Sequence, residues 1–223
     1  MQTAKGLSPL YTPNSKILIL GTLPSQTSRE TQKYYANNSN RFWKIICEFF
    51  GVAVPDTYDQ RIQMLNSHNI AVWDLIDTCE IEGSKDSTIT NPEFNDLQDL
   101  LDKTKIEVVL LNGKIAYEMY EQRFKGLNVL YKLVPSTSPI NAKFDKQQWF
   151  EALDLSTYTY ENAVRHYVKL MGNKPLYKVV KTDNETTYTF DESYGIARTC
   201  VECGVNSSML KQALIKAIEK GQI

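Results

Sequence analysis

The stretch "KILILGTLPS", Lys16–Ser25, decides the fold, because a short apolar run stops at Gly21 and continues directly as a polar loop. A run of this length, closed by a glycine, is typical of a buried strand. The sequence predicts further strands of the same kind at 70–76, at 105–113 and in the segment 127–141, which runs on into a loop.

Helical patterns separate these strands, and the polar segment 22–40 is expected to be one long loop. The predicted helices cover 40–51, 57–69, 91–104 with Asn95 as its cap, 114–125 and 144–155. Strands that alternate with helices favour a parallel sheet covered on both faces. We therefore predict an α/β fold, a three-layer α/β/α arrangement around a central, mostly parallel, four-stranded sheet.

After about residue 157 the alternation of apolar strands with helices gives way to a different pattern, so we expect two domains, 1–157 and 158–223. The second is predicted to be a small α+β domain, with a polar hairpin at 175–192 whose turn is "DNET". Two helices should follow within 195–221, with a break at 204–206. Their spacing fits either a helix-turn-helix-like motif or a plain helical hairpin.

Ligands of open α/β sheets bind beyond the carboxyl ends of the strands, where the loops 21–25, 112–114 and 135–141 should meet. The expected crevice holds Ser25, Asn37, Asn38, Asn40, Asn112, Ser136, Ser138 and Asn141, with Tyr34 and Tyr35 alongside. Asp and Glu are absent from the three loops, so we expect almost no ionisable group there. Neutral amides and aromatic faces suit a nucleobase, because they read its edge and stack on its ring.

The formal net charge of −1 does not by itself indicate a nucleic-acid-binding protein, but the charges are unevenly distributed. Bases outnumber acids around the first loop and flank the third: Lys16, Arg29, Lys33, Arg41, Lys44, Lys132, Lys143 and Lys146. This distribution is either a basic rim for phosphates or an ordinary scatter of surface charge.

Several classes of protein are not indicated by the sequence. The chain lacks an apolar run of about 18 residues and begins without the apolar core of a signal peptide. We therefore expect a cytoplasmic protein with reduced thiols at its cysteines, Cys47, Cys79, Cys200 and Cys203. The last pair is only half of a closed zinc site, so we expect neither a metal nor another cofactor.

Common catalytic motifs are also missing. There is no phosphate-binding Walker loop and no dinucleotide fingerprint, and Ser25 and Ser138 lack the GxSxG elbow of a nucleophilic serine. His68 and His166 fall on predicted helices outside the three loops.

Five motifs occur in order: "LILGTLPSQTS", "YYANNSNRFW", "VWDLIDTCEIEGSKDSTI", "VVLLNG" and "PSTSPIN". Together they resemble the uracil-DNA glycosylase superfamily over roughly residues 8–155, and most of all its hypoxanthine (deoxyinosine) DNA glycosylase branch. The resemblance implies DNA with a deaminated base as the partner, and a monomer that flips the base out and hydrolyses its N-glycosidic bond. It also implies roles for individual residues.

The resemblance implies that Asn40, the asparagine before the Phe-Trp pair, is catalytic. The position of the water-activating asparagine of related uracil enzymes falls on Leu23, which has no polar group. Tyr35 matches the aromatic residue that stacks on the extruded base, and Asn112 is expected to meet the edge of that base. The predicted base-binding residues are Gly21, Thr22, Leu23, Pro24, Ser25, Tyr35 and Asn112.

The loop 135–141 matches the DNA-contacting loop of the superfamily. Ser136 stands in place of a histidine that stabilises the departing base, and Ile140 in place of the leucine wedge that fills the hole in the duplex. The predicted DNA-binding residues are Ser136, Ser138, Pro139, Ile140, Asn141 and Lys143.

We therefore predict a monofunctional DNA glycosylase for hypoxanthine, and uracil as a second candidate base. The chain departs from the family pattern at Asn37 and Asn38, where His-Pro is usual. That departure supports an alternative, a catalytically weakened module that recognises damaged or foreign DNA. A small-molecule hydrolase on a doubly wound sheet is a further reading, and it predicts no salt-dependent affinity for DNA.

Overall fold

The computed structural model describes residues 2–182, 186–203 and 205–223. It separates into two compact units: the N-terminal unit ends at Leu153, and the C-terminal unit begins at Asp154. The boundary predicted after residue 157 therefore falls just inside the C-terminal unit, within the 3-10 turn Leu155–Tyr158.

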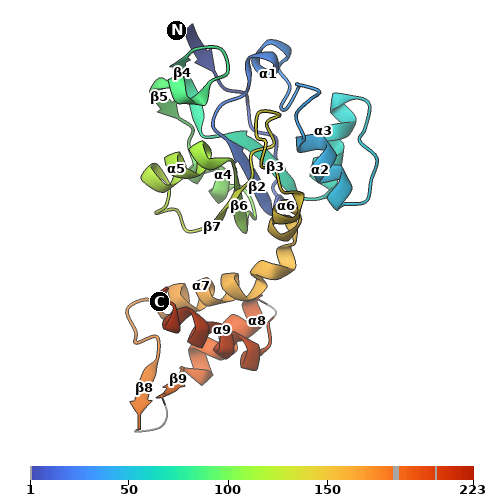
Figure 1. Ribbon diagram of the computed structural model, residues 1–223. Coiled ribbons are helices and arrows are strands. Elements are labelled where there is room, and N and C mark those ends of the chain that lie inside the picture. Colours follow the sequence, from blue (N-terminus) through green and yellow to red (C-terminus); the bar gives the residue numbers. More distant parts are fainter. Residues whose placement is uncertain (1, 183–185, 204) are drawn as a thin grey trace. The chain divides into compact units, whose positions relative to one another are not determined.

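The centre of the N-terminal unit is a four-stranded parallel sheet with the strand order β3-β2-β6-β7 (Figure 1). Its strands are β2 (Ile17–Gly21), β3 (Ile70–Asp74), β6 (Val108–Asn112) and β7 (Leu130–Val134). The predicted α/β class and parallel sheet are confirmed. The register pairs Gly21 with Asp74 and Leu20 with Leu111, so neighbouring strands end close together at one edge.

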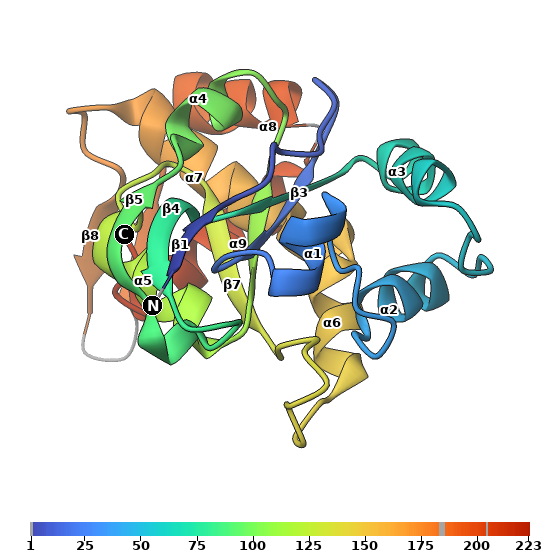
Figure 2. The same cartoon turned by 90° about the horizontal axis from the view of Figure 1, so that it is seen from above.

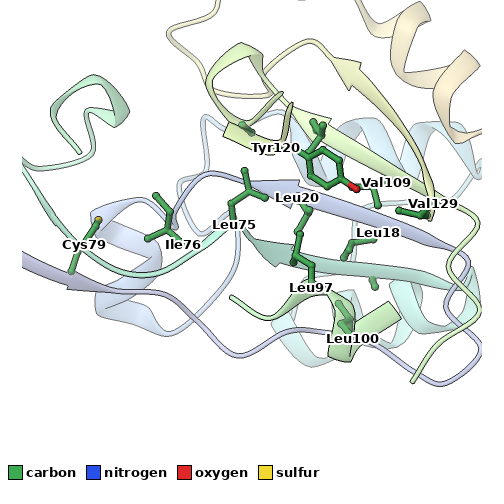
Figure 3. Close-up of a cluster of buried hydrophobic side chains, with 14 of the residues drawn as sticks. Leu18, Leu20, Leu75, Ile76, Cys79, Leu97, Leu100, Val109, Tyr120 and Val129 are labelled. Atoms are coloured by element: carbon green, nitrogen blue, oxygen red, sulfur yellow. The ribbon is translucent and has the colours of Figure 1, made fainter. Parts of the chain in front are cut away.

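One face of this sheet is covered by α4 (Leu97–Asp102) and α5 (Lys114–Arg123). Leu18 and Leu20 of β2 pack there with Leu97 and Tyr120 in one buried cluster (Figure 3). The pattern follows from strand geometry, because alternate residues of a strand point to the same face.

The other face receives the intervening residues, such as Ile17 and Ile19, which are also fully or almost fully buried. The helices α2 (Phe42–Phe49), α3 (Tyr58–Ser67) and α6 (Lys146–Leu153) lie together on that side (Figure 2). α3 contacts β3, and α6 contacts both β7 and α2. This face carries two of the protein's largest fully buried side chains, Phe42 and Trp149.

A second sheet, which the sequence did not predict, consists of the antiparallel strands β1, β4 and β5 in the order β1-β4-β5. Its strands are β1 (Gln2–Lys5), β4 (Ile76–Ile81) and β5 (Thr90–Phe94), with the 3-10 turn Asp86–Thr88 between the last two. β1 and β5 are mostly exposed, and neither has the apolar run that predicts a buried strand. β5 also contains Pro92, which fits only an edge strand.

One loop prediction and one helix prediction for the N-terminal unit are corrected. The segment 22–40 is not one loop, because it contains α1 (Gln26–Thr31), capped by Ser25. The helix predicted from 91 begins only at Leu97, and its cap is Asp96 rather than Asn95. The Asn95 side chain instead donates a hydrogen bond to the backbone carbonyl of Asp74.

The C-terminal unit contains α7 (Thr159–Met171), for which the sequence analysis gave no bounds although it placed His166 on a helix. It also contains the predicted hairpin, the antiparallel strands β8 (Lys178–Lys181) and β9 (Thr186–Thr189). A π-helical turn, Glu192–Ile196, leads into α8 (Ala197–Cys203) and α9 (Ser207–Glu219). Most of the predicted hairpin turn, 183–185, and Gly204 of the predicted break lie outside the described residues.

α7 packs against both α8 and α9 around a buried apolar cluster. Cys200 and Cys203 are free thiols that pack against this cluster. Among the described residues, no group of three or more potential ligands could hold a metal ion. In the same part of the chain, none of the helices combines the length and the apolar character that crossing a bilayer requires.

Candidate functional site

A cavity of about 250 Å³ opens at the carboxyl edge of the parallel sheet in the N-terminal unit. It lies where the strands β2, β3 and β6 end. Of the predicted site residues, the following line it: Gly21, Thr22, Leu23, Pro24, Ser25, Tyr35, Asn40, Asn112, Ser136, Ser138, Pro139 and Ile140. Asn141 and Lys143 do not line it. The volume is just below the roughly 300–1,000 Å³ of pockets for drug-sized ligands, which suits a single ring system.

Tyr35 forms part of the cavity wall and is held in a fixed position. Its backbone is left-handed, with φ of 51°, and its ring stacks on Phe42 with the centroids 3.7 Å apart. Burial raises the pKa of Tyr35 above its usual value, with a smaller contribution from Asp74, so the phenol stays neutral. Its hydroxyl accepts a hydrogen bond from Asn112.

The Asn112 side chain joins three segments of the site. Its amide nitrogen donates to the Tyr35 hydroxyl at 3.1 Å and to Thr137 Oγ1 at 3.0 Å. Its amide oxygen accepts from the Thr137 backbone nitrogen at 2.9 Å. Both donor hydrogens of the carboxamide are therefore used within the protein, and only the second lone pair of the oxygen remains for a ligand.

Asn40 lines the cavity two residues before the start of α2. Its side-chain oxygen accepts a hydrogen bond from the backbone nitrogen of Phe42 at 3.0 Å, a local side-chain-to-backbone bond just outside the helix, whose N-cap is Arg41. The backbone nitrogen of Asn40 in turn donates to the carbonyl of Asn37 at 2.9 Å. The bond from Phe42 fixes the rotamer of the side chain and orients its amide group.

The loop 135–141 is fixed from two sides. The Arg41 guanidinium donates to the Ser138 carbonyl at 2.8 Å, and the Arg41 backbone nitrogen donates to the Thr137 carbonyl. The indole of Trp149 on α6 donates to the Pro135 carbonyl at 2.8 Å. The tip of the loop is different, because Ile140 is 90% exposed.

The expectation of a crevice almost without ionisable groups is wrong, because two carboxyl groups line the cavity. Asp74, the last residue of β3, is only 4% exposed, and its Oδ2 is buried without a hydrogen-bond partner. Burial, and secondarily the nearby charge of Asp86, raises the pKa of Asp74 from its ordinary 3.8 to about 8. At neutral pH this group is therefore mostly a carboxylic acid.

The second carboxyl group, Asp86, comes from the 3-10 turn between β4 and β5. Burial raises its pKa as well, opposed by a hydrogen bond from Thr22. Sequence reasoning missed both residues for identifiable causes. The predicted strand 70–76 placed Asp74 within a strand although β3 ends there, and Asp86 belongs to the unpredicted antiparallel sheet. The sequence signal that could have identified Asp74 is an acidic residue at the end of an apolar strand.

Gly21 ends β2 directly beside Asp74, and an added Cβ there would collide with Asp74 Oδ1. We expect Gly21→Ala to lower the free energy of unfolding by about 1–3 kcal/mol, the usual cost of inserting a methyl group into a packed site. Urea unfolding measures the change. The matched control is Gly126→Ala, because a Cβ at Gly126 meets nothing within 4 Å. Equal losses in the two variants would contradict the proposed close contact.

The basic residues noted in the sequence do not all face solvent freely. Arg29 donates to the carbonyls of Pro24 and Gly83, so it joins the first loop to the segment between β4 and β5. Lys16 pairs with Glu107, and Lys146 pairs with Glu48. Lys33, Lys44 and Lys143 are exposed and remain the candidates for phosphate contacts.

Residues 8–157 match the family model of the uracil DNA glycosylase superfamily, which spans nearly all of the N-terminal unit. Two curated relatives are named hypoxanthine DNA glycosylase. The relative from Methanosarcina acetivorans is 34% identical over 146 residues, 65% of this chain and 92% of its own length. The relative from Methanosarcina barkeri is 31% identical over 153 residues, 66% of this chain and 96% of its own length.

A solved structure shares this architecture. It is the solution NMR structure of a candidate uracil DNA glycosylase from Methanosarcina acetivorans, with a TM-score of 0.62 and 32% sequence identity. The similarity covers 68% of this chain and 97% of that protein.

Proposed function

Because the chain belongs to the uracil DNA glycosylase superfamily, we propose that it is a monofunctional DNA glycosylase that removes hypoxanthine, and secondarily uracil, from DNA. The base is flipped out of the helix and its N-glycosidic bond is hydrolysed. The names of the two Methanosarcina relatives support hypoxanthine as the first substrate. The observation that carries the proposal is the cavity itself, in which Tyr35 and Asn40 lie with the ends of three parallel strands.

In the proposed reaction Tyr35 is the stacking surface for the flipped base. Its ring is backed by Phe42, and its hydroxyl is tied to Asn112, so little freedom is lost when a base binds. Stacking of this kind contributes about 1–3 kcal/mol per base. The rigid wall therefore helps to hold the base outside the helix.

Asn40 is the proposed group that orients the attacking water. Its amide oxygen is one candidate, through the lone pair not used by Phe42, and the amide nitrogen is the other. An asparagine is too weak a base to deprotonate water fully. It is sufficient here, because the sugar becomes cationic as the bond breaks and needs only a well-positioned weak nucleophile.

The proposal includes hydrolysis without a covalent enzyme intermediate. Lys114, which follows Asn112 by two residues, is largely exposed and pairs with Glu118 at 3.3 Å. Among the described residues, no lysine lines the cavity. We expect borohydride to trap no adduct between the protein and DNA, and a trapped adduct would contradict this part of the proposal.

The test of the proposed function is a panel of duplexes that contain hypoxanthine, uracil, xanthine or mismatched thymine. Each duplex is incubated with the protein and then treated with hot alkali, which breaks the strand at an abasic site. Breaks in the hypoxanthine duplex, and only after alkali, are the expected result. No breaks in any duplex would refute the proposed activity.

One observation favours a second candidate function, a DNA-binding module with weak catalysis. Asn37, which stands where the family usually has His, lines the cavity, and its side chain accepts only from the nearby Ser39 backbone in the described structure. The same panel separates the two functions. Tight binding of damaged duplexes without strand breaks would favour the module over the enzyme.

Ile140 offers a direct test of duplex binding. We expect Ile140→Ala to reduce base release from duplex DNA about tenfold, because the side chain would offset part of the few kcal/mol that unstacking costs. The melting temperature of the protein should not change, since the side chain is 90% exposed. Val201→Ala, at another highly exposed position on α8, is the control. An equal reduction with single-stranded DNA would contradict the wedge, because single strands leave no hole to fill.

A further inference from the structure

The buried acid Asp74, which lines the cavity, has no role in the proposed function as described above. Asp74 lines the cavity, is 96% removed from solvent and leaves Oδ2 without a partner. Its other oxygen lies against the Cα of Gly21, where a larger residue would collide with it. A buried polar group without a hydrogen bond destabilises a protein by about 1–3 kcal/mol, so packing alone does not explain why this acid is here.

The charged and titratable groups that act on Asp74 come from two segments. Asp86 faces it from the turn between β4 and β5, and Tyr34 and Tyr35 face it from the segment before α2. Within the described part of the chain, these groups include no cation. Burial, and secondarily the charge of Asp86, favours the protonated form of Asp74, which then presents a hydrogen-bond donor to the cavity.

A glycosylase needs such a donor, because the departing base receives the electron pair of the broken bond. This argument rests on the proposed function. We propose that Asp74 is a catalytic residue that donates its carboxylic proton to the departing base, and that Asp86 sets the pH range in which Asp74 carries this proton. The donor would face the base while Asn40 orients water at the sugar.

The proposed step conserves atoms and electrons. The C1′–N bond breaks, and its electron pair stays with the base, which takes the proton from the Asp74 carboxyl. A water molecule forms the new C1′–O bond and releases one proton, which restores the Asp74 acid. The net change is consumption of one water and formation of a neutral base and an abasic sugar.

The test compares Asp74→Asn, Asp86→Asn and a control, Asp59→Asn, in single-turnover release of hypoxanthine from a duplex between pH 6 and pH 10. Asp59 is exposed on α3 and does not line the cavity. In the wild type the rate should fall tenfold per pH unit above about pH 8, where Asp74 loses its proton. Asp74→Asn should be about 100-fold slower at pH 6.5, within the usual range for a lost general acid, and should lack this alkaline decrease.

Asp86→Asn tests the second half of the proposal. It keeps a side chain that can bond to Thr22, and it removes the negative charge that helps to hold the proton on Asp74. The alkaline decrease should therefore move to lower pH. A merely structural role for Asp86 would change the rate at all pH values without moving that decrease. Asp59→Asn should match the wild type.

Protein stability gives a readout that needs no DNA. The pKa of Asp74 is higher in the folded protein, about 8, than its ordinary value of 3.8. The folded state therefore holds a proton that the unfolded state has lost, and the free energy of unfolding falls as pH rises from about 4 to about 8. Asp74→Asn should remove this share of the pH dependence, measured by urea unfolding at pH 5 and pH 8.

The outcomes separate the two proposals. If the wild type releases none of the four bases, the proposed function fails and this inference fails with it. If the wild type releases hypoxanthine but Asp74→Asn keeps the same rate and the same alkaline decrease, only the inference is overturned. A rate loss in Asp74→Asn with the alkaline decrease retained would also overturn it, because another group would then be the proton donor.

Discussion

Replacement of Asn40 by alanine is expected to slow hypoxanthine release at least about 100-fold. The residue lines the cavity, and its rotamer is fixed by the bond from the Phe42 backbone nitrogen. If its amide positions the attacking water, loss of the amide leaves the water without a fixed direction, and small errors in such placement cost about this factor. Single-turnover kinetics on the hypoxanthine duplex measure the loss.

This substitution also removes the hydrogen bond from the Phe42 backbone nitrogen, which by itself lowers stability by about 1 kcal/mol. Asn40→Ser separates the two effects, because a serine hydroxyl can accept the same backbone hydrogen bond but cannot place a carboxamide at the sugar. We expect Asn40→Ser to unfold like the wild type and yet to be nearly as slow as Asn40→Ala. Wild-type rates in the serine variant would show that position 40 contributes only this hydrogen bond.

The largest expected change in stability follows from Trp149→Ala. Trp149 on α6 is fully buried, and its indole nitrogen donates to the Pro135 carbonyl at 2.8 Å. Removing a buried tryptophan side chain typically costs 3–5 kcal/mol, since it combines lost burial with a new cavity. We expect the free energy of unfolding, measured with urea, to fall by about this amount.

Trp149→Phe is the matched control, because it retains most of the buried ring and removes the indole donor. Its expected loss is smaller, and about 1–3 kcal/mol of it reflects the Pro135 carbonyl left without this partner. Since that carbonyl begins the loop 135–141, we also expect slower base release. A stable Trp149→Ala protein would contradict the assignment of Trp149 as the anchor of the loop.

The hydrogen bonds of the site explain why its residues act together. Asn112 joins Tyr35 to Thr137, and Arg41 joins the start of α2 to the same loop. A base that used the Asn112 amide as a donor would first have to replace one of these bonds. We therefore expect the base edge to be met by the free lone pair of the Asn112 oxygen and by Asp74.

Local sequence signals were enough to predict the parallel sheet and three of the loops at its edge. The runs that became β2 and β6 are short, apolar and closed by Gly21 and by Asn112-Gly113, and these are local signals. Gly113 has φ of 108°, a conformation that a glycine allows without strain, so the turn after β6 is also encoded locally. The amide side chains of the cavity could be predicted for the same reason, because they lie next to these locally encoded segments.

Which of these groups are free for a ligand, and which carry a proton, depends on contacts between segments that are distant in the sequence. The partners of Asn40 and Asn112 were not legible in the sequence, because a side chain's hydrogen bonds depend on segments distant along the chain. The antiparallel sheet was hidden because β1 and β5 are polar edge strands. The turn between two strands of that sheet places Asp86 near Asp74. The pKa of Asp74 is raised by burial and by this second acid, and neither can be recognised from the residue type alone.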